Sequence, residues 1–316
     1  MIRLSLLSLA ALSACSGLDD LVPGTVDDDS TLPALELGAT KLHLRTVGDP
    51  SAPVVIAIHG GPGGDYRGME PLAQLADQGL FVVLWDQRGA GLSRRHPCNE
   101  VEVDDYRRDL EAIVDRFAPP GRPVFLVGHS WGAMYATWFI NEHPGRITGA
   151  VLVEPGGFTA AEVNAYFSRL LGTAAFDEGL NDALWSAQLV TPDDHVRADL
   201  SASTMFEATS KPLGMSTTDP MPFWRSGGVV NACLPVSAGA FDWTQNLAAQ
   251  TSDTLFVRGD RNTVLRAEDV ARLAAHYPNA RVVTVPGAGH DLIWSHRDDF
   301  VALVASYLAA QLEGAS

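Results

Sequence analysis

The chain is predicted to fold as an α/β protein built on a mostly parallel sheet. From residue 53 onward, short apolar runs of strand length alternate with amphipathic stretches of helix length, apart from one long interruption. This alternation is typical of parallel strands that are joined by helices. In addition, a Gly-x-Ser-x-Gly pentapeptide at residues 128–132 directly follows one of the apolar runs, and it is the best single indication of function.

Six apolar runs are predicted as buried strands, because each is short and bounded by turn residues. They cover residues 54–59, 81–85, 124–128, 147–153, 254–258 and 281–285, and an antiparallel ribbon is expected before them at 35–47. Amphipathic spacing predicts helices at 104–117, 131–143, 266–277 and 298–312. Together these elements form one predicted core, residues 35–155 and 251–316, on either side of an insertion.

The insertion, residues 156–250, interrupts the alternation of strands and helices. Two helical pieces, 160–171 and 182–189, stand between irregular stretches that contain Pro, Thr and Trp. The segment is too long to be a structureless loop in a compact domain, so we predict an inserted helical cap. A cap over the carboxyl ends of the strands usually shapes a substrate pocket.

The first residues have the features of an export signal. Arg3 provides a positive charge, residues 4–12 are mostly apolar, and Leu-Ser-Ala precedes Cys15. Leu-Ser-Ala-Cys resembles the lipobox of bacterial lipoproteins, which implies that residues 1–14 are a signal peptide and that Cys15 carries a lipid anchor. The alternative is an ordinary cleaved signal with an incidental cysteine. We expect an exported protein of the bacterial cell envelope, held to the membrane by this anchor alone through an acidic, solvated tether at residues 15–34.

Composition excludes some classes of partner. The formal net charge of −16 is spread along the 316 residues, which argues against nucleic acid, because phosphate binding needs a basic surface. Neither Cys98 nor Cys233 has metal-ligand spacing with another Cys or His, and the nine histidines form no H-E-x-x-H motif, so no metal or other cofactor is expected. Since thiols of exported proteins tend to oxidise, Cys98 and Cys233 are candidates for a disulfide.

Ser130, at the centre of the pentapeptide, lies where a predicted strand turns into a predicted helix. Small flanking residues permit a strained turn, which pushes the hydroxyl out of the sheet as in the nucleophile elbow of hydrolases. The neighbouring His129 is expected to point away from Ser130 and to be structural. The candidate base is His290, which follows the last predicted strand in a turn with flanking glycines.

A glycine-rich loop at residues 59–64 is the candidate oxyanion hole. It directly follows a strand, and its glycines allow backbone N–H groups to face a bound carbonyl oxygen. The expected donors are the N–H groups of Gly61 and Trp131, with Gly60 as a further candidate. A phosphate-binding loop does not fit, because Tyr66 occupies the place of the third glycine of such a motif and no lysine follows.

Four segments together resemble the α/β-hydrolase superfamily and, in particular, its proline iminopeptidase branch. They are residues 59–64, 86–93, 128–132 and 289–290. The resemblance covers about residues 40–155 and 250–312 and leaves the cap unmatched. It implies an eight-stranded sheet flanked by helices with a helical cap, and hydrolysis through an acyl-enzyme on Ser130. It also implies that the segment 86–93 is a structural turn, with a substrate role for Arg88 the less favoured interpretation.

The chain departs from the family pattern at the acid that orients the base. Family members usually carry Gly-x-x-Asp after the seventh strand, whereas here the fourth position is Asn262, which can orient an imidazole but supplies no charge. Two carboxylates are candidates, Asp260 in the same turn and Glu154 after the strand beside the nucleophile strand. We favour Glu154 because some α/β-hydrolases place their acid there and glutamate is long enough to reach the histidine loop. A role for Glu154 in binding a substrate amine is a further alternative.

These observations predict a serine hydrolase that acts on a small molecule or a short peptide. An aminopeptidase that releases N-terminal proline is the nearest family interpretation, and a carboxylesterase acting on a small acyl ester is the alternative. A catalytically impaired binding protein, suggested by Asn262, is the third hypothesis. Five acidic residues of the cap are candidates for binding a free amino terminus: Glu162, Asp177, Glu178, Asp182 and Glu207. Haloalkane and epoxide chemistry on this fold would need an aspartate at position 130.

Overall fold

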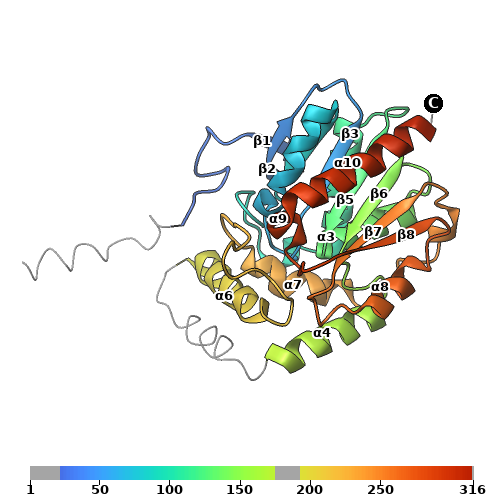
Figure 1. Cartoon of the computed structure of the whole chain (residues 1–316). Coiled ribbons are helices and arrows are strands. Elements are labelled where there is room, and N and C mark those ends of the chain that lie inside the picture. The colour runs from blue at the N-terminus through green and yellow to red at the C-terminus, as the bar shows by residue number, and fades with distance from the viewer. Residues whose placement is uncertain (1–21, 175–192, 315–316) are drawn as a thin grey trace, which may run out of the picture.

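A computed structural model describes residues 22–174 and 193–314 of the chain (Figure 1). Within those residues the central sheet has eight strands, in the order β1-β2-β4-β3-β5-β6-β7-β8. Strand β2 runs antiparallel to its neighbours β1 and β4, and all the other neighbouring strands are parallel. The predicted fold class, a mostly parallel eight-stranded sheet flanked by helices, is therefore confirmed.

The strands agree with the predicted apolar runs to within two residues at each end. Their bounds are β1 (Ala34–Leu37), β2 (Thr40–Val47), β3 (Val54–Ile58), β4 (Phe81–Trp85), β5 (Val124–His129), β6 (Gly149–Val153), β7 (Thr254–Gly259) and β8 (Ala280–Val285). Strands β3 to β7 are buried along their whole length. This explains why they are continuous apolar runs rather than alternating ones.

The helical segments agree less closely with the predictions. The longer ones are α2 (Val103–Phe117), α3 (Trp131–Glu142), α4 (Ala160–Ala174), α6 (Asp194–Thr209), α7 (Gly228–Ala238), α8 (Ala267–Ala274) and α10 (Arg297–Gly314). The shorter or 3₁₀ segments are η2 (Tyr66–Gln78), η3 (Cys98–Glu100), η4 (Leu247–Ala249) and α9 (Leu292–Ser295). Segment η2 was not predicted; it is a 3₁₀ helix with Pro71 inside it.

Helices cover both faces of the sheet and enclose two apolar layers. Alternate residues of β3 point to opposite sides, with Ile56 in the layer beneath α2, α3 and α8, and Val55 in the layer beneath η2, α9 and α10. In Figure 1, α10 crosses one face of the sheet while α3 lies behind it. This arrangement leaves only the ends of the strands open for a site.

The predicted insertion forms a cap, whose helices α4, α6 and α7 gather at one end of the sheet (Figure 1). The two ends of the insertion lie side by side, since Ala160 N donates to Phe241 O and Trp243 N donates to Phe158 O, both at 3.0 Å. The chain thus leaves the core and returns to it at one place. The structure shows α4 close to its predicted position, whereas the helix predicted at 182–189 lies outside the described residues.

The sequence predicted that the acidic stretch at residues 15–34 is a solvated tether. From residue 25 onward, the structure differs from this prediction. Val26 is only 1% exposed, and its N–H donates to the carbonyl of Leu92 at 2.8 Å. Asp27 pairs with Arg94 at 2.8 Å, and this ion pair lowers the pKa of Asp27. An apolar side chain and a paired carboxylate therefore hold this part of the stretch against the core.

The signal peptide predicted at residues 1–14 and the lipidation site predicted at Cys15 lie outside the described residues. In the parts of the chain that are described, no helix combines the length and the apolar character needed to cross a bilayer.

Candidate active site

Ser130 occupies a strained turn between β5 and α3. Its backbone has φ 54° and ψ −118°, a conformation that costs a non-glycine residue about 1–3 kcal/mol. The turn is closely packed, since a Cβ on Gly128 would lie 2.3 Å from Gly132 O, and one on Gly132 would lie 1.9 Å from Ile58 O. The two glycines of the pentapeptide are thus required by backbone contacts, and the turn presents Ser130 at the carboxyl end of the sheet.

Glu154, not Asp260, lies against His290. Oε2 of Glu154 is 3.0 Å from Nδ1 of His290, and Oε1 accepts the backbone N–H of Gly259 at 2.7 Å. Glu154 is fully buried directly after β6, and its own φ is 52°. Asp260 is exposed and accepts the N–H of Gly287 at 2.8 Å. The structure therefore places the glutamate that the sequence favoured against the histidine, and Ser130 and His290 line one cavity.

Asn262 adds a contact that the sequence did not reveal. Its side-chain amide donates to Oε2 of Glu154, while its Oδ1 accepts the N–H groups of Val264 at 2.9 Å and Leu265 at 3.0 Å. An asparagine can do both, because it carries a donor and an acceptor on one side chain. An aspartate at this position would place a second carboxylate on Glu154 instead.

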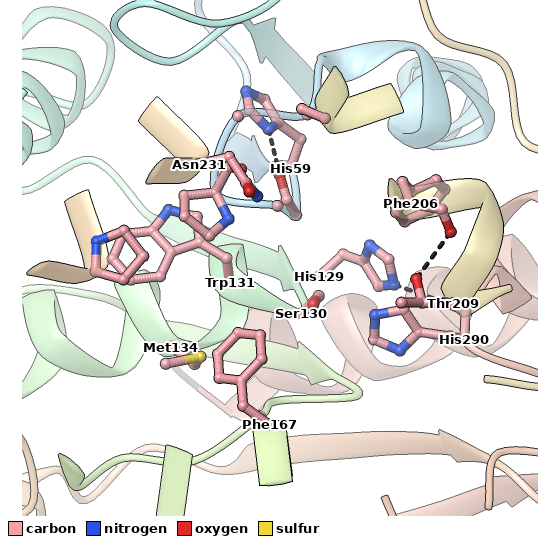
Figure 2. Close-up of a pocket in the computed structure, with 18 of the residues that line it drawn as sticks. His59, His129, Ser130, Trp131, Met134, Phe167, Phe206, Thr209, Asn231 and His290 are labelled. Carbon is pink, nitrogen blue, oxygen red and sulfur yellow. Dashed lines mark hydrogen bonds between the residues drawn. The ribbon is translucent and has the colours of Figure 1, made fainter. Parts of the chain in front are cut away.

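His129 lines the same cavity as Ser130 and His290 (Figure 2), and its hydrogen bond to the backbone of His290 agrees with the structural role that the sequence predicted. Its ring centroid is 4.7 Å from that of His290, and its Nε2 lies 2.6 Å from the backbone oxygen of His290. Burial, with the neighbouring His290, lowers the pKa of His129 to about 3. His129 is therefore neutral, and it donates a hydrogen bond that holds the backbone of the candidate base.

The glycine-rich loop lies directly against Ser130. A Cβ on Gly60 would be 3.1 Å from that of Ser130, and Gly61 has φ 129°, which only glycine adopts readily. The Gly61–Pro62 peptide bond is cis. Within the described part of the chain, the N–H groups of Gly61 and Trp131 donate to no protein group, as expected of donors kept for a ligand.

Gln87 connects this loop to Trp131, a role that the sequence did not show. Its side-chain amide donates to His59 O at 2.8 Å, and its Oε1 accepts the indole N–H of Trp131 at 3.0 Å. The N–H of Gln87 also donates to Nε2 of His59 at 3.0 Å, so Nδ1 carries the ring proton and donates to Gly60 O at 2.9 Å. Burial lowers the pKa of His59, which keeps this neutral tautomer.

The turn at residues 86–93 makes structural contacts, and Arg88 is not among the described residues that line the cavity. Asp86 is fully buried and accepts the N–H groups of Tyr66 and Leu92, both at 2.8 Å. Arg88 forms a bidentate pair with Asp109, with both contacts at 2.8 Å. These contacts agree with the favoured interpretation of this segment.

A cavity of about 300 Å³ opens above Ser130 between the sheet and the cap. Figure 2 shows Ser130 near its centre, with His129 and His290 on one side and Trp131 on the other. Large apolar side chains predominate in the lining, among them Met134, Phe167, Met205, Phe206, Met221 and Phe223. Such a cavity suits a small apolar ligand with one reactive polar group.

Asp65 is the single acidic side chain in the described lining of the cavity. Its two oxygens accept N–H groups from Arg67 at 3.0 Å, Trp224 at 2.5 Å and Arg225 at 3.2 Å. Burial and the nearby Asp86 raise the pKa of Asp65 to about 7. This carboxyl group is therefore already engaged in binding the cap.

The other acidic candidates for binding an amino terminus are not found in the cavity lining. Glu162 accepts the N–H groups of Phe158 at 2.9 Å and Thr159 at 3.1 Å, and Glu207 is exposed. Asp177, Glu178 and Asp182 lie outside the described residues.

Cys98 and Cys233 are joined in a disulfide across 135 positions of the chain, with their Cα atoms 5.6 Å apart. The bond connects η3 of the core to α7 of the cap. Among the described residues, no group of three or more His, Cys, Asp or Glu side chains is arranged to hold a metal ion.

Comparison with known proteins adds independent information. A family model described as alpha/beta hydrolase fold matches residues 53–297. Proline iminopeptidase PfmaB of Pestalotiopsis fici is 25% identical over 296 residues, which are 87% of this chain and 98% of that protein. The crystal structure of a proline iminopeptidase from Mycobacterium smegmatis has a TM-score of 0.62 at 19% identity, covering 90% of this chain and 100% of that one. An esterase from Exiguobacterium antarcticum has a TM-score of 0.59 at 18% identity, covering 91% and 100% respectively.

Proposed function

The chain belongs to the α/β-hydrolase family, and on that premise we propose that it is a serine hydrolase that cleaves small esters with apolar groups. The observation that carries this choice of substrate is the apolar lining of the cavity above Ser130. A carboxylesterase needs an apolar site for the acyl or alcohol group and donors for one developing oxyanion. Both requirements match the described residues.

Ser130 is the nucleophile in this proposal. Its Oγ attacks the ester carbonyl carbon while Nε2 of His290 takes the hydroxyl proton. The carbonyl oxygen becomes an oxyanion, which accepts hydrogen bonds from the N–H groups of Gly61 and Trp131. The intermediate then expels the alcohol, which receives the proton from His290, and the acyl group remains on Ser130. Water attacks this acyl-enzyme with the same histidine as base, which releases the acid and restores the serine.

Glu154 orients the base and stabilises its charged form. With Nδ1 of His290 bound to Oε2, the other ring nitrogen is left unprotonated for Ser130. The imidazolium that forms during attack lies beside a buried carboxylate, so it gains a favourable charge interaction at that moment. Asn262 and the N–H of Gly259 hold the same carboxylate in place.

An aminopeptidase that releases N-terminal proline is the second candidate. It is favoured by the similarity to a proline iminopeptidase across nearly the whole of that protein. Such an enzyme would bind a free ammonium group, and a buried ammonium needs a carboxylate partner. In the described lining that partner could only be Asp65, whose oxygens already accept three N–H groups. We therefore place the esterase first. Asn262 no longer supports the hypothesis of a catalytically impaired binding protein, because Glu154 supplies the negative charge that Asn262 lacks.

The deciding experiment compares p-nitrophenyl esters of short acyl chains with proline naphthylamide, the latter both free and blocked at its nitrogen. We expect turnover of the esters, rising as methylene groups are added until the cavity is filled, and much slower turnover of the naphthylamides. Ser130→Ala is the control and should lower every rate by about 10⁴-fold or more.

Two results would contradict the proposal. Faster turnover of free proline naphthylamide than of any ester, lost on blocking the nitrogen, would establish the aminopeptidase instead. Failure of a fluorophosphonate probe to label Ser130 in the folded protein would contradict any serine hydrolase function.

A further inference from the structure

A segment of the cap, residues 224–231, lies along the glycine-rich loop at residues 59–64 and the Asp65 that follows it. The N–H of Gly227 donates to Gly63 O at 2.6 Å, and the side-chain amide of Asn231 donates to Pro62 O at 3.2 Å. Figure 2 shows Asn231 beside the loop that begins at His59. Together with the N–H groups that bind Asp65, these contacts connect the cap to the loop and its end at three places, Pro62, Gly63 and Asp65.

The approach of the two backbones is too close for side chains at the contact. A Cβ on Gly63 would lie 2.5 Å from Gly227 O, and one on Gly227 would lie 2.5 Å from the oxygen of Gly89. Gly63 also has φ 91°, where a side chain would be strained. The loop is therefore fitted to the cap by its backbone.

The cap segment is itself fixed to the core. Asp199 of α6 accepts the N–H of Gly228 at 2.7 Å and pairs with Arg225 at 2.6 Å and with Arg95 of the core at 3.2 Å. These charged groups are nearly buried, so the pairs are poorly screened by solvent. The disulfide at Cys233 ties the middle of α7 to the core.

We propose that Asn231 is a positioning residue for the oxyanion hole, which is complete only when the cap holds the loop. This inference rests on the proposed serine hydrolase function. The Asn231 amide holds the carbonyl of Pro62, and next to it the N–H of Gly227 holds the carbonyl of the Gly63–Gly64 peptide. The N–H of that peptide donates to Gly60 O at 3.2 Å, and the Gly60 carbonyl lies in the same peptide plane as the Gly61 N–H, so the cap sets the direction of this donor through the loop. Donors for an oxyanion work only when preorganised, and a small displacement has a large effect on the chemical step.

The test measures kcat and KM on a p-nitrophenyl ester, and the inhibition constant of an alkyl trifluoromethyl ketone, which forms an oxyanion on the serine. For Asn231→Ala we expect kcat to fall about tenfold, KM to stay within about twofold, and the ketone to bind about tenfold more weakly. Asn231→Asp should be at least as impaired, because it puts a carboxylate against the Pro62 carbonyl. Urea unfolding of each variant reports whether the fold is retained.

Asn246→Ala is the matched control, since it removes a similar amide-to-carbonyl hydrogen bond, to Asn141 at 3.1 Å, away from the loop. It should leave kcat and ketone binding unchanged. A raised KM with unchanged kcat in Asn231→Ala would show direct substrate contact and overturn the inference, as would no change at all. Wild-type Ser130 that resists a fluorophosphonate probe would instead contradict the proposed function, so the two failures are distinguishable.

Discussion

Asn262 donates its side-chain amide to Oε2 of Glu154, the same oxygen that lies 3.0 Å from Nδ1 of His290. Asn262 stands where the family pattern expects the acid, and Glu154 comes from the end of the neighbouring strand. The Glu154 carboxylate thus accepts hydrogen bonds from the His290 ring, the Asn262 amide and the N–H of Gly259. The departure from the pattern at position 262 and the buried glutamate at position 154 are two parts of one arrangement.

Glu154→Gln should reduce kcat by about 10³- to 10⁴-fold on the preferred ester, because an amide cannot stabilise the imidazolium and disturbs its tautomer. Asp260→Asn is the matched control. It changes an exposed carboxylate in the adjoining turn, and it should leave kcat within about twofold. Steady-state kinetics of both variants provide the measurement. Loss of turnover only in the Asp260 variant would show that the acid is assigned to the wrong residue.

Asn262→Asp should lower activity although it restores the family residue. Two buried carboxylates in contact cannot both ionise readily, so one would hold a proton near neutral pH. We also expect the free energy of unfolding to fall by about 1–3 kcal/mol, because the amide donor to Glu154 is lost. Kinetics and urea unfolding test both effects. If Glu154→Gln combined with Asn262→Asp were as active as the wild type, position 262 would hold the acid.

Removing the Cys98–Cys233 disulfide should lower the free energy of unfolding by about 2–5 kcal/mol, since the bond closes a loop of 135 positions. The double variant Cys98→Ser, Cys233→Ser is to be compared with the wild type by urea unfolding, each with and without a thiol reductant. Reductant should destabilise the wild type to the level of the double variant and leave that variant unchanged. An equal effect of reductant on both proteins would contradict the prediction.

Asp65→Asn should alter the pH dependence of stability. The pKa of Asp65 is raised to about 7 in the folded protein, mainly by burial, from an ordinary value of 3.8. The folded state therefore holds this proton more tightly than the unfolded state, and the free energy of unfolding falls as the pH rises from about 4 to about 7.

The Asp65→Asn variant lacks this titration. Between about pH 4 and pH 7, its free energy of unfolding relative to that of the wild type should therefore rise by at most about 4 kcal/mol. Urea unfolding at pH 5 and pH 8 gives the comparison. If the free energies of unfolding of the two proteins differ by the same amount at both pH values, the pKa of Asp65 is not raised in the folded protein.

Much of the fold could be predicted because the strands are continuous apolar runs that signal their position locally. The helices of the cap were harder to predict. Helix α7 contains Pro235, a residue that disfavours helix interiors, and it is stabilised by its contacts with the core and with α6. The acidic stretch before β1 also looked solvated, although Val26 is buried.

The sequence by itself marked Ser130 and His290 as candidates, because each lies in a short glycine-containing turn after a predicted strand. Only the tertiary structure decided which carboxylate faces the histidine, since Glu154 leaves its strand at φ 52° toward His290 while Asp260 is exposed. It also decided what holds the glycine-rich loop. Gln87 and Asn231 reach that loop from segments far away in the chain, and such contacts depend on how the strands and the cap pack together.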